Sequence, residues 1–419
     1  MTEPNRPTVC VHGLGYIGLP TAAILANNGY DVYGYDADPE RRAALAAGTV
    51  SFDEADLERF IGMALDDGLE IVDSARSADF HLICVPTPYD RDHDQIDLTY
   101  VEAAGETIAT LLRPGDTIVL ESTVPPGTTA RRLRAVLEDS GIAIPDAASL
   151  VYSPETVLPG DTLSELREND RLVGAVDGDD CAPVVALYES FVKGEVRTTD
   201  ATTAEFVKLI QNASRDVNIA FANEIAKLAH EFDIDAREAI AFANGHPRVD
   251  ILDPGPGVGG HCLPIDPLFL SHNNNIPMLT ETARRVNDGM PEYVGKLLLA
   301  ALDDPQASSV ALLGVAYKGG VADTRQSPSL SLSKFLQERC VGDLRQTDPY
   351  VDQSEHDIVS LRSALDGADA AAIVTDHPEY GALSPDLFAE QMRGRVIVDA
   401  RGLLNCNRWE AAGFDVYQI

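Results

Sequence analysis

The segment that most constrains the fold is the run Gly13-Leu14-Gly15-Tyr16-Ile17-Gly18, which stands between an apolar stretch (residues 8–12, TVCVH) and the helical pattern TAAILANN. In a strand–turn–helix unit, the first glycine permits a tight turn and the second admits a phosphate group close to the backbone. The third lets the helix pack closely on the strand, and the helix N-terminus faces the phosphate charge. The pattern therefore predicts a dinucleotide-binding α/β unit, whereas the same glycines alone would also fit a turn without a ligand.

A second expected strand (residues 31–36, DVYGYD) ends in Asp36, 18 residues after Gly18. A carboxylate at this position can accept hydrogen bonds from the adenosine ribose and repels the extra phosphate of NADP, so NAD is the expected cofactor. Arg41 is a candidate neighbour of the ribose or adenine, or else a solvated helix residue. Thr87 and Thr123 follow later strands and are candidate cofactor contacts, although proline and threonine also suit plain turns.

Strand and helix patterns alternate in two parts of the chain, which predicts an α/β protein with parallel sheets. Further strands are expected at residues 80–85, 117–121, 149–152, 171–176, 309–315, 344–348, 370–375, 395–399 and 414–417. The part between is helical, with one long stretch over 200–245 and a Gly/Pro-rich loop at 253–267. We expect an N-terminal Rossmann dinucleotide-binding domain (1–197), a central all-helical connector (198–302) and a C-terminal Rossmann-like α/β domain (303–419). The last domain has no GxGxxG.

The charge balance narrows the possible partners, because 67 acidic residues face 32 basic ones and only six of those are Lys. A net charge of −35 repels nucleic acid and anionic membranes, and in dilute buffer it destabilises the compact state. Molar salt shortens the screening length to about 3 Å. We therefore expect a halophilic protein from a cytosol of high internal salt, with an ordinary acidic protein as the alternative.

Nothing in the sequence predicts a membrane segment or a signal peptide. No apolar run approaches the roughly 20 residues that a membrane helix needs, and the N-terminal sequence lacks the pattern of a secretory leader. A cytoplasmic location is expected. The six cysteines (positions 10, 84, 181, 262, 340 and 406) show no CxxC pair and no metal-ligand spacing, so neither a disulfide framework nor a metal site is predicted.

Cys262 differs from the other cysteines because it follows Gly259-Gly260-His261 in the glycine-rich loop. Glycines let a backbone approach a ligand closely, and nearby cationic groups can give a thiol the thiolate character of a nucleophile. Cys10 and Cys84 lie in expected strands, where a cysteine is usually a small buried apolar residue. Cys262 is therefore the candidate nucleophile.

Lys208 and Asn212 are four residues apart on the expected long helix and so share one face, with Arg215 one short turn further on. An ammonium and a carboxamide presented together can stabilise an oxyanion. A solvated helix face is the alternative, although solvated faces of this chain are rich in Asp and Glu. Glu155, in the segment Ser153-Pro154-Glu155 after an expected strand, is a candidate for activating water.

Taken together these residues resemble the UDP-glucose/GDP-mannose dehydrogenase family over nearly the whole chain. The matching segments are GLGYIGLP (13–20), CVPTP (84–88), STVPPGTT (122–129), SPETVLPG (153–160), AEFVKLIQN (204–212), HPRV (246–249), GVGGHCLPID (257–266), GVAYKGGVADTRQSPS (314–329) and VDARG (398–402). GGHCLPID in particular is similar to the branch that oxidises UDP-N-acetyl-D-mannosamine, since the UDP-glucose branch usually has Lys where Ile265 stands. The resemblance implies two successive oxidations of a C6 hydroxyl to a carboxylate, through a thiohemiacetal and a thioester on Cys262.

The resemblance also implies roles for individual residues. Lys208 and Asn212 would stabilise oxyanions, Asp266 would hold a water or exchange protons, and Glu155 would aid hydrolysis of the thioester. The residues implied to contact the UDP-sugar are Thr156, Val157, Lys208, Asn212, Arg215, His246, Arg248, Gly259, Tyr317, Lys318 and Arg325. The branch usually has Arg where Thr156 stands, so UDP-N-acetylglucosamine and UDP-glucose remain alternative substrates.

Two broader functional alternatives follow from the same residues. A two-electron dehydrogenase of the 6-phosphogluconate or hydroxyacyl-CoA type would need neither the Cys262 loop nor the third α/β region. A protein that binds NAD only as a sensor would not need the three catalytic candidates Glu155, Lys208 and Cys262. The long central helices form a dimer interface in the family, so a homodimer is expected, although they could equally be intramolecular core.

Overall fold

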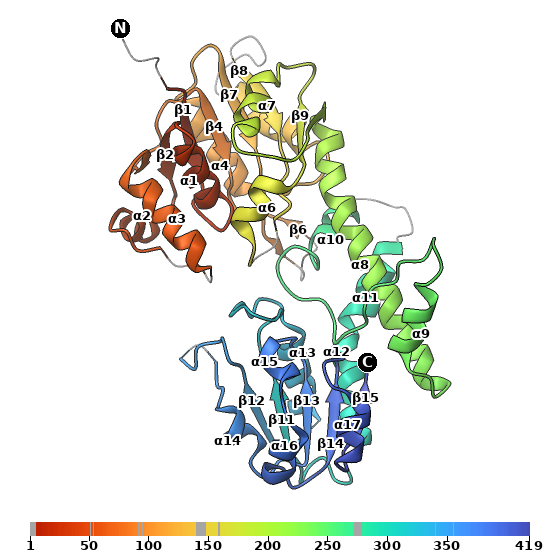
Figure 1. The fold of residues 1–419 in the computed structure, drawn as a ribbon. Coiled ribbons are helices and arrows are strands. Elements are labelled where there is room, and N and C mark those ends of the chain that lie inside the picture. Colours follow the sequence, from red (N-terminus) through yellow and green to blue (C-terminus); the bar gives the residue numbers. More distant parts are fainter. Residues whose placement is uncertain are drawn as a thin grey trace. The chain divides into compact units, whose positions relative to one another are not determined.

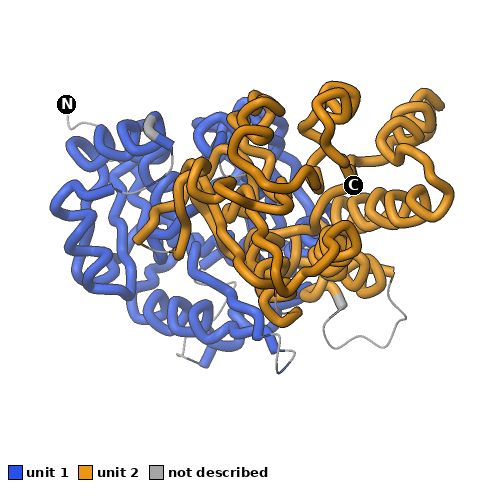
Figure 2. The backbone as a smooth tube through the Cα atoms, turned by 90° about the horizontal axis from the view of Figure 1, so that it is seen from below, with its two compact units in different colours: residues 1–211 blue, residues 212–419 orange. Residues whose placement is uncertain are grey.

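The computed structural model describes residues 6–419 except 51, 53, 91–92, 94, 140–147, 158–159, 272–278, 340 and 355. The chain consists of two compact units, residues 1–211 and residues 212–419 (Figure 2). The boundary falls within one long helix, α8 (Ala201–Glu231).

An eight-stranded sheet forms the centre of the first unit (Figure 1), with strand order β10-β9-β8-β7-β4-β1-β2-β3. Its strands are β1 (Thr8–His12), β2 (Asp31–Tyr35), β3 (Leu69–Ile71), β4 (Phe80–Ile83), β7 (Asp116–Leu120), β8 (Ala148–Tyr152), β9 (Arg171–Ala175) and β10 (Val196–Asp200). The strands pair in parallel except for β8 and β9, which are antiparallel. A short hairpin of β5 (Tyr89–Asp90) and β6 (Gln95–Ile96) lies outside the sheet.

Helices cover both faces of this sheet, so its central strands are buried on both sides. The helical elements are α1 (Gly18–Asn27), α2 (Pro39–Ala46), α3 (Ala55–Asp66), α4 (Thr99–Ala109), the π-helix η1 (Thr128–Leu133), α5 (Arg134–Asp139), α6 (Thr162–Glu168) and α7 (Ala182–Glu189). Val9 and Val11 of β1 join the core beneath α1 and α3. Since side chains alternate along a strand, Cys10 and His12 lie on the opposite face.

The helical stretch expected over 200–245 is divided between α8 and a shorter helix, α9 (Ala236–Ala243). The chain turns at Asp233, whose φ of 53° is incompatible with a continuing α-helix. Asp235 then caps α9 by accepting hydrogen bonds from the backbone N–H groups of Arg237 and Glu238. The break therefore has a local cause in the sequence Asp-Ile-Asp.

The second unit contains a five-stranded parallel sheet of order β12-β11-β13-β14-β15. Its strands are β11 (Ser309–Leu313), β12 (Asp343–Thr347), β13 (Ala370–Ile373), β14 (Val396–Asp399) and β15 (Asp415–Gln418). Its further helices are α10 (Asp266–Ser271), α11 (Leu279–Asp288), α12 (Met290–Ala300), α13 (Pro328–Glu338), α14 (Leu361–Leu365), α15 (Pro378–Gly381), α16 (Pro385–Gln391) and α17 (Cys406–Ala411). The predicted α/β class, with a helical region between two Rossmann-type sheets, is confirmed.

Candidate active site

The glycine-rich turn has the geometry that a bound dinucleotide requires. Gly13 has a φ of +92°, and a Cβ there would lie 2.7 Å from the carbonyl oxygen of Cys84. A Cβ on Gly18 would collide with the carbonyl oxygen of Gly13, so α1 packs directly on the turn. Gly15 by contrast faces open space, which fits the close approach of a pyrophosphate. Tyr16 and Ile17 complete the turn, with Ile17 at the N-cap of α1.

Asp36 connects this turn to the end of β2. Its carboxylate accepts hydrogen bonds from the backbone N–H of Leu14 (2.8 Å) and of Asp38 (2.9 Å), which fixes its orientation at the expected ribose position. Arg41 points into solvent from α2. Its neighbour Arg42, which the sequence analysis did not single out, donates to the backbone carbonyls of Asp36 and Ala37.

The two threonines expected near the cofactor are in contact with each other. The hydroxyl of Thr87 donates to the backbone carbonyl of Thr123 at 2.7 Å, and Ser122 donates to the carbonyl of Val85. The loops that follow β4 and β7 are thereby joined at the same edge of the sheet as the glycine-rich turn. Ligands of open parallel sheets bind outside this edge.

Glu54 was not predicted to be part of the site, but it holds the glycine-rich turn against the segment after Glu155. Its carboxylate accepts hydrogen bonds from the hydroxyls of Tyr16 and Thr162 and from the backbone N–H groups of Gly160 and Thr162. Burial alone would raise the pKa of Glu54, but these hydrogen bonds lower it. The carboxylate therefore remains an acceptor for all of them.

Glu155 follows β8 and is buried. One of its oxygens accepts hydrogen bonds from the backbone N–H groups of Thr156 (2.6 Å) and Val157 (2.7 Å), and the other lies 2.8 Å from a guanidinium nitrogen of Arg171. The Glu155 carboxylate therefore fixes the backbone of Thr156 and Val157. Both of these residues are expected to contact the sugar, and Glu155 itself is expected to activate water.

Arg171 of β9 lies between two buried carboxylates, Glu155 and Glu121. Its guanidinium is also 4.9 Å from the ring centroid of Tyr188, whose hydroxyl donates to Glu121. Burial raises the pKa of Glu121, and the charge of Arg171 opposes that effect only in part. The thiol of Cys84 donates to the same carboxylate. The pairing of Arg171 with Glu155 and with the neighbouring Glu121 was not predicted from the sequence.

This arrangement predicts a large stability cost for Arg171→Met. Removing the guanidinium leaves two buried carboxylates without a cation, and breaking a buried pair in this way costs about 3–5 kcal/mol. Urea unfolding at constant salt measures the change. The matched control is Arg197→Met on the adjacent strand β10, whose exposed ion pairs with Asp170 and Glu195 are expected to contribute at most about 1 kcal/mol. Equal unfolding midpoints for the two variants would contradict the assignment.

In the second unit, the loop that carries Cys262 packs on the loop after β11. A Cβ on Gly259 would lie 2.6 Å from the Cβ of Tyr317, and one on Gly260 would lie 3.1 Å from its ring. The backbone N–H of Gly260 donates to the carbonyl of Arg325 at 2.9 Å. A side chain larger than that of glycine would collide at these contacts. The Cys262 loop and the loop of residues 317–326 therefore pack directly on each other.

Cys262 is half-buried, and its backbone carbonyl accepts hydrogen bonds from the N–H groups of Ile265 and Asp266 at the start of α10. Burial, with the nearby negative charges of Asp323 and Cys262, raises the pKa of Tyr317 to about 12. Arg325 forms a two-pronged ion pair with Asp323, with its Nε 2.9 and 3.0 Å from the two carboxylate oxygens. Tyr317 and Arg325, both expected to contact the UDP-sugar, thus lie near the Cys262 loop, and Asp323 was not predicted.

The helix α8 carries Lys208 and Asn212 one turn apart, and Lys208 is buried. The side chain of Asn212 donates a hydrogen bond of 2.5 Å to the carboxylate of Asp266, which joins two of the expected catalytic residues. Arg215 is exposed on the same helix.

The remaining expected substrate residues lie in loops. His246 and Arg248 are exposed after α9, where the backbone N–H of Arg248 donates to the His246 ring at 3.3 Å. Lys318 is half-buried beside Tyr317. Arg401, in the segment VDARG, donates to the backbone carbonyl of Tyr317 and helps to fix that loop.

Comparison with known proteins gives full-length matches. Three sequence models of the UDP-glucose/GDP-mannose dehydrogenase family match in order: the NAD binding domain (residues 7–192), the central domain (202–289) and the UDP binding domain (311–406). The UDP-N-acetyl-D-mannosamine dehydrogenase of Methanocaldococcus jannaschii is 41% identical over 418 residues, which cover 98% of this chain and 96% of the relative. The NDP-N-acetyl-D-galactosaminuronic acid dehydrogenase of Ralstonia solanacearum is 37% identical over 424 residues (98% and 99%).

Among solved structures, the UDP-D-ManNAc dehydrogenase of Pyrococcus horikoshii superposes with a TM-score of 0.92 at 40% identity, covering 98% of this chain and 99% of the other. Its similarity extends over both units of the chain, as does that of the sequence models. The glycine-rich turn, the oriented Asp36 and these matches agree on the cofactor. The chain therefore belongs to the UDP-glucose/GDP-mannose dehydrogenase family and is an NAD-dependent UDP-sugar dehydrogenase.

Proposed function

We propose that this protein oxidises the C6 hydroxyl of UDP-N-acetyl-D-mannosamine to the carboxylate in two successive steps, with Cys262 as the covalent nucleophile. The observation that carries the proposal is the packing of the Cys262 loop on Tyr317 and the neighbouring backbone of Arg325, in the part of the chain that matches the UDP binding domain. A nucleotide held by that loop would present its sugar near the thiol. Bound NAD would supply the hydride acceptor for each oxidation.

The residues around the thiol supply the other parts of the chemistry. The thiol of Cys262 would add to the C6 aldehyde and form a thiohemiacetal, whose oxyanion Lys208 and Asn212 would stabilise. Loss of a hydride from this adduct leaves a thioester. Asp266 is held by the side-chain amide of Asn212 and would exchange the protons of these steps through a water.

Glu155 would assist the hydrolysis of the thioester that releases the product. Its carboxylate is fixed by two backbone N–H groups and Arg171, so that it can accept a proton from the water that attacks the thioester. Hydrolysis frees Cys262 and yields the uronate. The product would serve the synthesis of a surface polysaccharide or glycan.

The preferred sugar is the feature that most needs an experiment, because Thr156 stands where the branch usually has Arg. A panel of UDP-N-acetylmannosamine, UDP-N-acetylglucosamine and UDP-glucose is assayed in molar KCl, and NADH is counted per sugar consumed. We expect the highest kcat/KM with UDP-N-acetylmannosamine and two NADH per sugar. One NADH per sugar would overturn the mechanism and favour a two-electron enzyme. NAD binding without turnover of any sugar would favour a sensor.

We further propose a homodimer formed through the central helices. In the second unit, large apolar side chains of α8, of α9 and of the turn between them are exposed: Phe221 (51%), Leu228 (54%), Phe232 (72%) and Phe242 (76%). A second copy of the chain would cover them, since exposed apolar patches of this kind mark protein interfaces. Light scattering in molar KCl should give twice the chain mass, and Phe242→Glu should shift it towards the monomer.

Among the described residues, no helix is long and apolar enough to cross a membrane. A cytoplasmic location is proposed with the dimer.

We propose that the protein requires high salt. Its net charge of −35 gives a self-repulsion that about 2 M KCl would screen and about 50 mM KCl would not. The free energy of unfolding in urea is therefore expected to rise between these two salt concentrations. Equal stability in both would show that the acidic surface is not a halophilic adaptation.

A further inference from the structure

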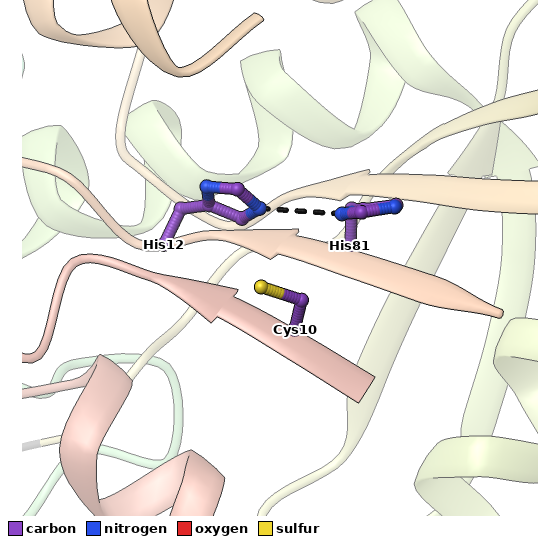
Figure 3. A group of neighbouring side chains, drawn as sticks. All are labelled: Cys10, His12 and His81. Carbon is purple, nitrogen blue, oxygen red and sulfur yellow. Dashed lines mark hydrogen bonds between the residues drawn. The ribbon is translucent and has the colours of Figure 1, made fainter. Parts of the chain in front are cut away.

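Three potential metal ligands meet inside the first unit, and none of them is assigned to catalysis. Cys10 and His12 are two residues apart on β1 and therefore lie on the same face of the sheet, and His81 of β4 pairs directly with Cys10 in the strand register. Figure 3 shows the three side chains close together, with a dashed line joining the rings of His12 and His81. All three are buried, with exposed fractions of 0 to 2%.

We propose that Cys10, His12 and His81 form a structural metal site for Zn²⁺ in the sheet beneath the glycine-rich turn. The two imidazole nitrogens that face each other, Nε2 of His12 and Nδ1 of His81, are 3.2 Å apart. Two nitrogens on one tetrahedral zinc lie about 3.3 Å apart, given Zn–N distances of about 2.0–2.1 Å. The spacing of the two nitrogens, set here by a hydrogen bond, therefore also suits a shared ion.

The cysteine sulfur completes a set of donors that zinc prefers. The ligand atoms of the three residues all lie within 4.8 Å of one another. A sulfur and a nitrogen on one zinc lie about 3.6 Å apart, so Sγ of Cys10 would need to move by about 1 Å at most. Two imidazoles and one thiolate favour zinc over magnesium or calcium, which take oxygen ligands. A tetrahedral zinc would take a fourth ligand, such as a water.

The protonation of the cluster also suits a metal. Burial, with the neighbouring imidazole charge of His81, lowers the pKa of His12 to about 3. Burial likewise lowers the pKa of His81 to about 4, so both rings are neutral and able to coordinate. Burial raises the pKa of the Cys10 thiol to about 11, and a bound cation would deprotonate it.

Charged groups around the cluster are mixed in sign. Asp79 and Asp116 lie near His81, together with Arg113, and Arg76 lies near Cys10. Asp116 is buried on β7, the strand beside β4. Its carboxylate is paired with Arg113 at 3.2 Å, so a zinc ion with one thiolate ligand would retain a single positive charge beside this ion pair.

Without an ion, the cluster leaves polar atoms unsatisfied. The two rings share one hydrogen bond, and the outer nitrogens Nδ1 of His12 and Nε2 of His81 have no partner although they are buried. Unsatisfied polar atoms in a core cost free energy, and a bound ion would replace the single hydrogen bond between the rings with two coordinate bonds on the inner nitrogens. The backbone carbonyl of His12 accepts from the N–H of Cys84, so an ion here would stiffen both loops that border the cofactor.

The test uses the full chain without a histidine tag, with Zn²⁺ for stability and Co²⁺ as the spectroscopic probe. At a free zinc concentration of about 100 times Kd, the apparent Tm is expected to rise by about 5–10 °C. Cobalt is expected to give a thiolate charge-transfer band and strong visible bands typical of tetrahedral coordination. Cys10→Ala should lose the charge-transfer band and the zinc-dependent shift. Cys406→Ser, which changes a half-buried thiol of the second unit, should keep both.

Cys262→Ser separates this site from binding at the catalytic thiol and its neighbour His261. A band that survives Cys262→Ser and disappears in Cys10→Ala supports the proposal, whereas the reverse pattern overturns it. Failure of the unaltered chain to bind either ion also overturns it. If Cys10→Ala does not fold, X-ray absorption spectroscopy of the zinc-loaded unaltered chain tests the site instead. Two imidazoles and one sulfur are expected as zinc ligands. A ligand shell without imidazole is incompatible with the site.

Discussion

Replacing Cys262 with Ser is expected to lower the rate of uronate formation by roughly 10³-fold or more, because an alcohol is a far weaker nucleophile than a thiolate at neutral pH. The substitution changes one atom and leaves the backbone contacts of the loop in place, so binding of NAD and of UDP should be nearly unchanged. Single-turnover assays should give at most one NADH per sugar, and mass spectrometry should find no covalent adduct.

The matched control is Cys406→Ser, which alters a half-buried thiol at the start of α17 in the same unit. It is expected to retain full turnover and two NADH per sugar. Normal carboxylate formation by Cys262→Ser would mean that no covalent step occurs at this residue.

Glu155→Gln is expected to separate oxidation from hydrolysis. Glutamine keeps the size of the side chain and an acceptor for the N–H groups of Thr156 and Val157, but it cannot take a proton from water. Loss of a general base typically costs 10²- to 10⁴-fold, so steady-state turnover should fall by about that factor. Both oxidations should still occur once, giving a burst of NADH followed by a slow phase while a thioester accumulates on Cys262.

Intact-protein mass spectrometry after rapid quenching measures that adduct. Glu168→Gln serves as the control, since this exposed glutamate of α6 is 3.8 Å from Lys193 and has no part in the proposed chemistry. A slow first oxidation without a burst would instead assign Glu155 to substrate binding or to the structure of the loop. The unfolding midpoint shows whether the loss of charge beside Arg171 has weakened the fold.

The parts of the fold that the sequence predicts well are those with local causes. The strand β1, the glycine-rich turn and α1 are adjacent in the chain, and their residue types have few other uses. Asp36 could be placed because it ends the next strand. The predicted strands of the second unit likewise end within one or two residues of the observed ones.

The partners of Glu155 could not be predicted, because Glu121, Arg171 and Tyr188 come from separate elements that become neighbours only in the folded sheet. An arginine in a strand carries no sign that it will be buried between two carboxylates. The same reasoning applies to Cys10, His12 and His81. Their spacing along the chain gave no indication of a metal site, and only the pairing of β1 with β4 brings them together.

The contact of Gly259 and Gly260 with Tyr317 and the backbone of Gln326 has a consequence for protein engineering. A chimera that exchanges the UDP binding domain of this enzyme for that of a relative would replace the surface on which the Cys262 loop rests. Because those contacts leave no room for a side chain, a small backbone shift in the donor would move the thiol itself. Substrate preference and reactivity are therefore expected to be inherited together, and a productive graft must carry the loop 257–262 along with the segment 317–326.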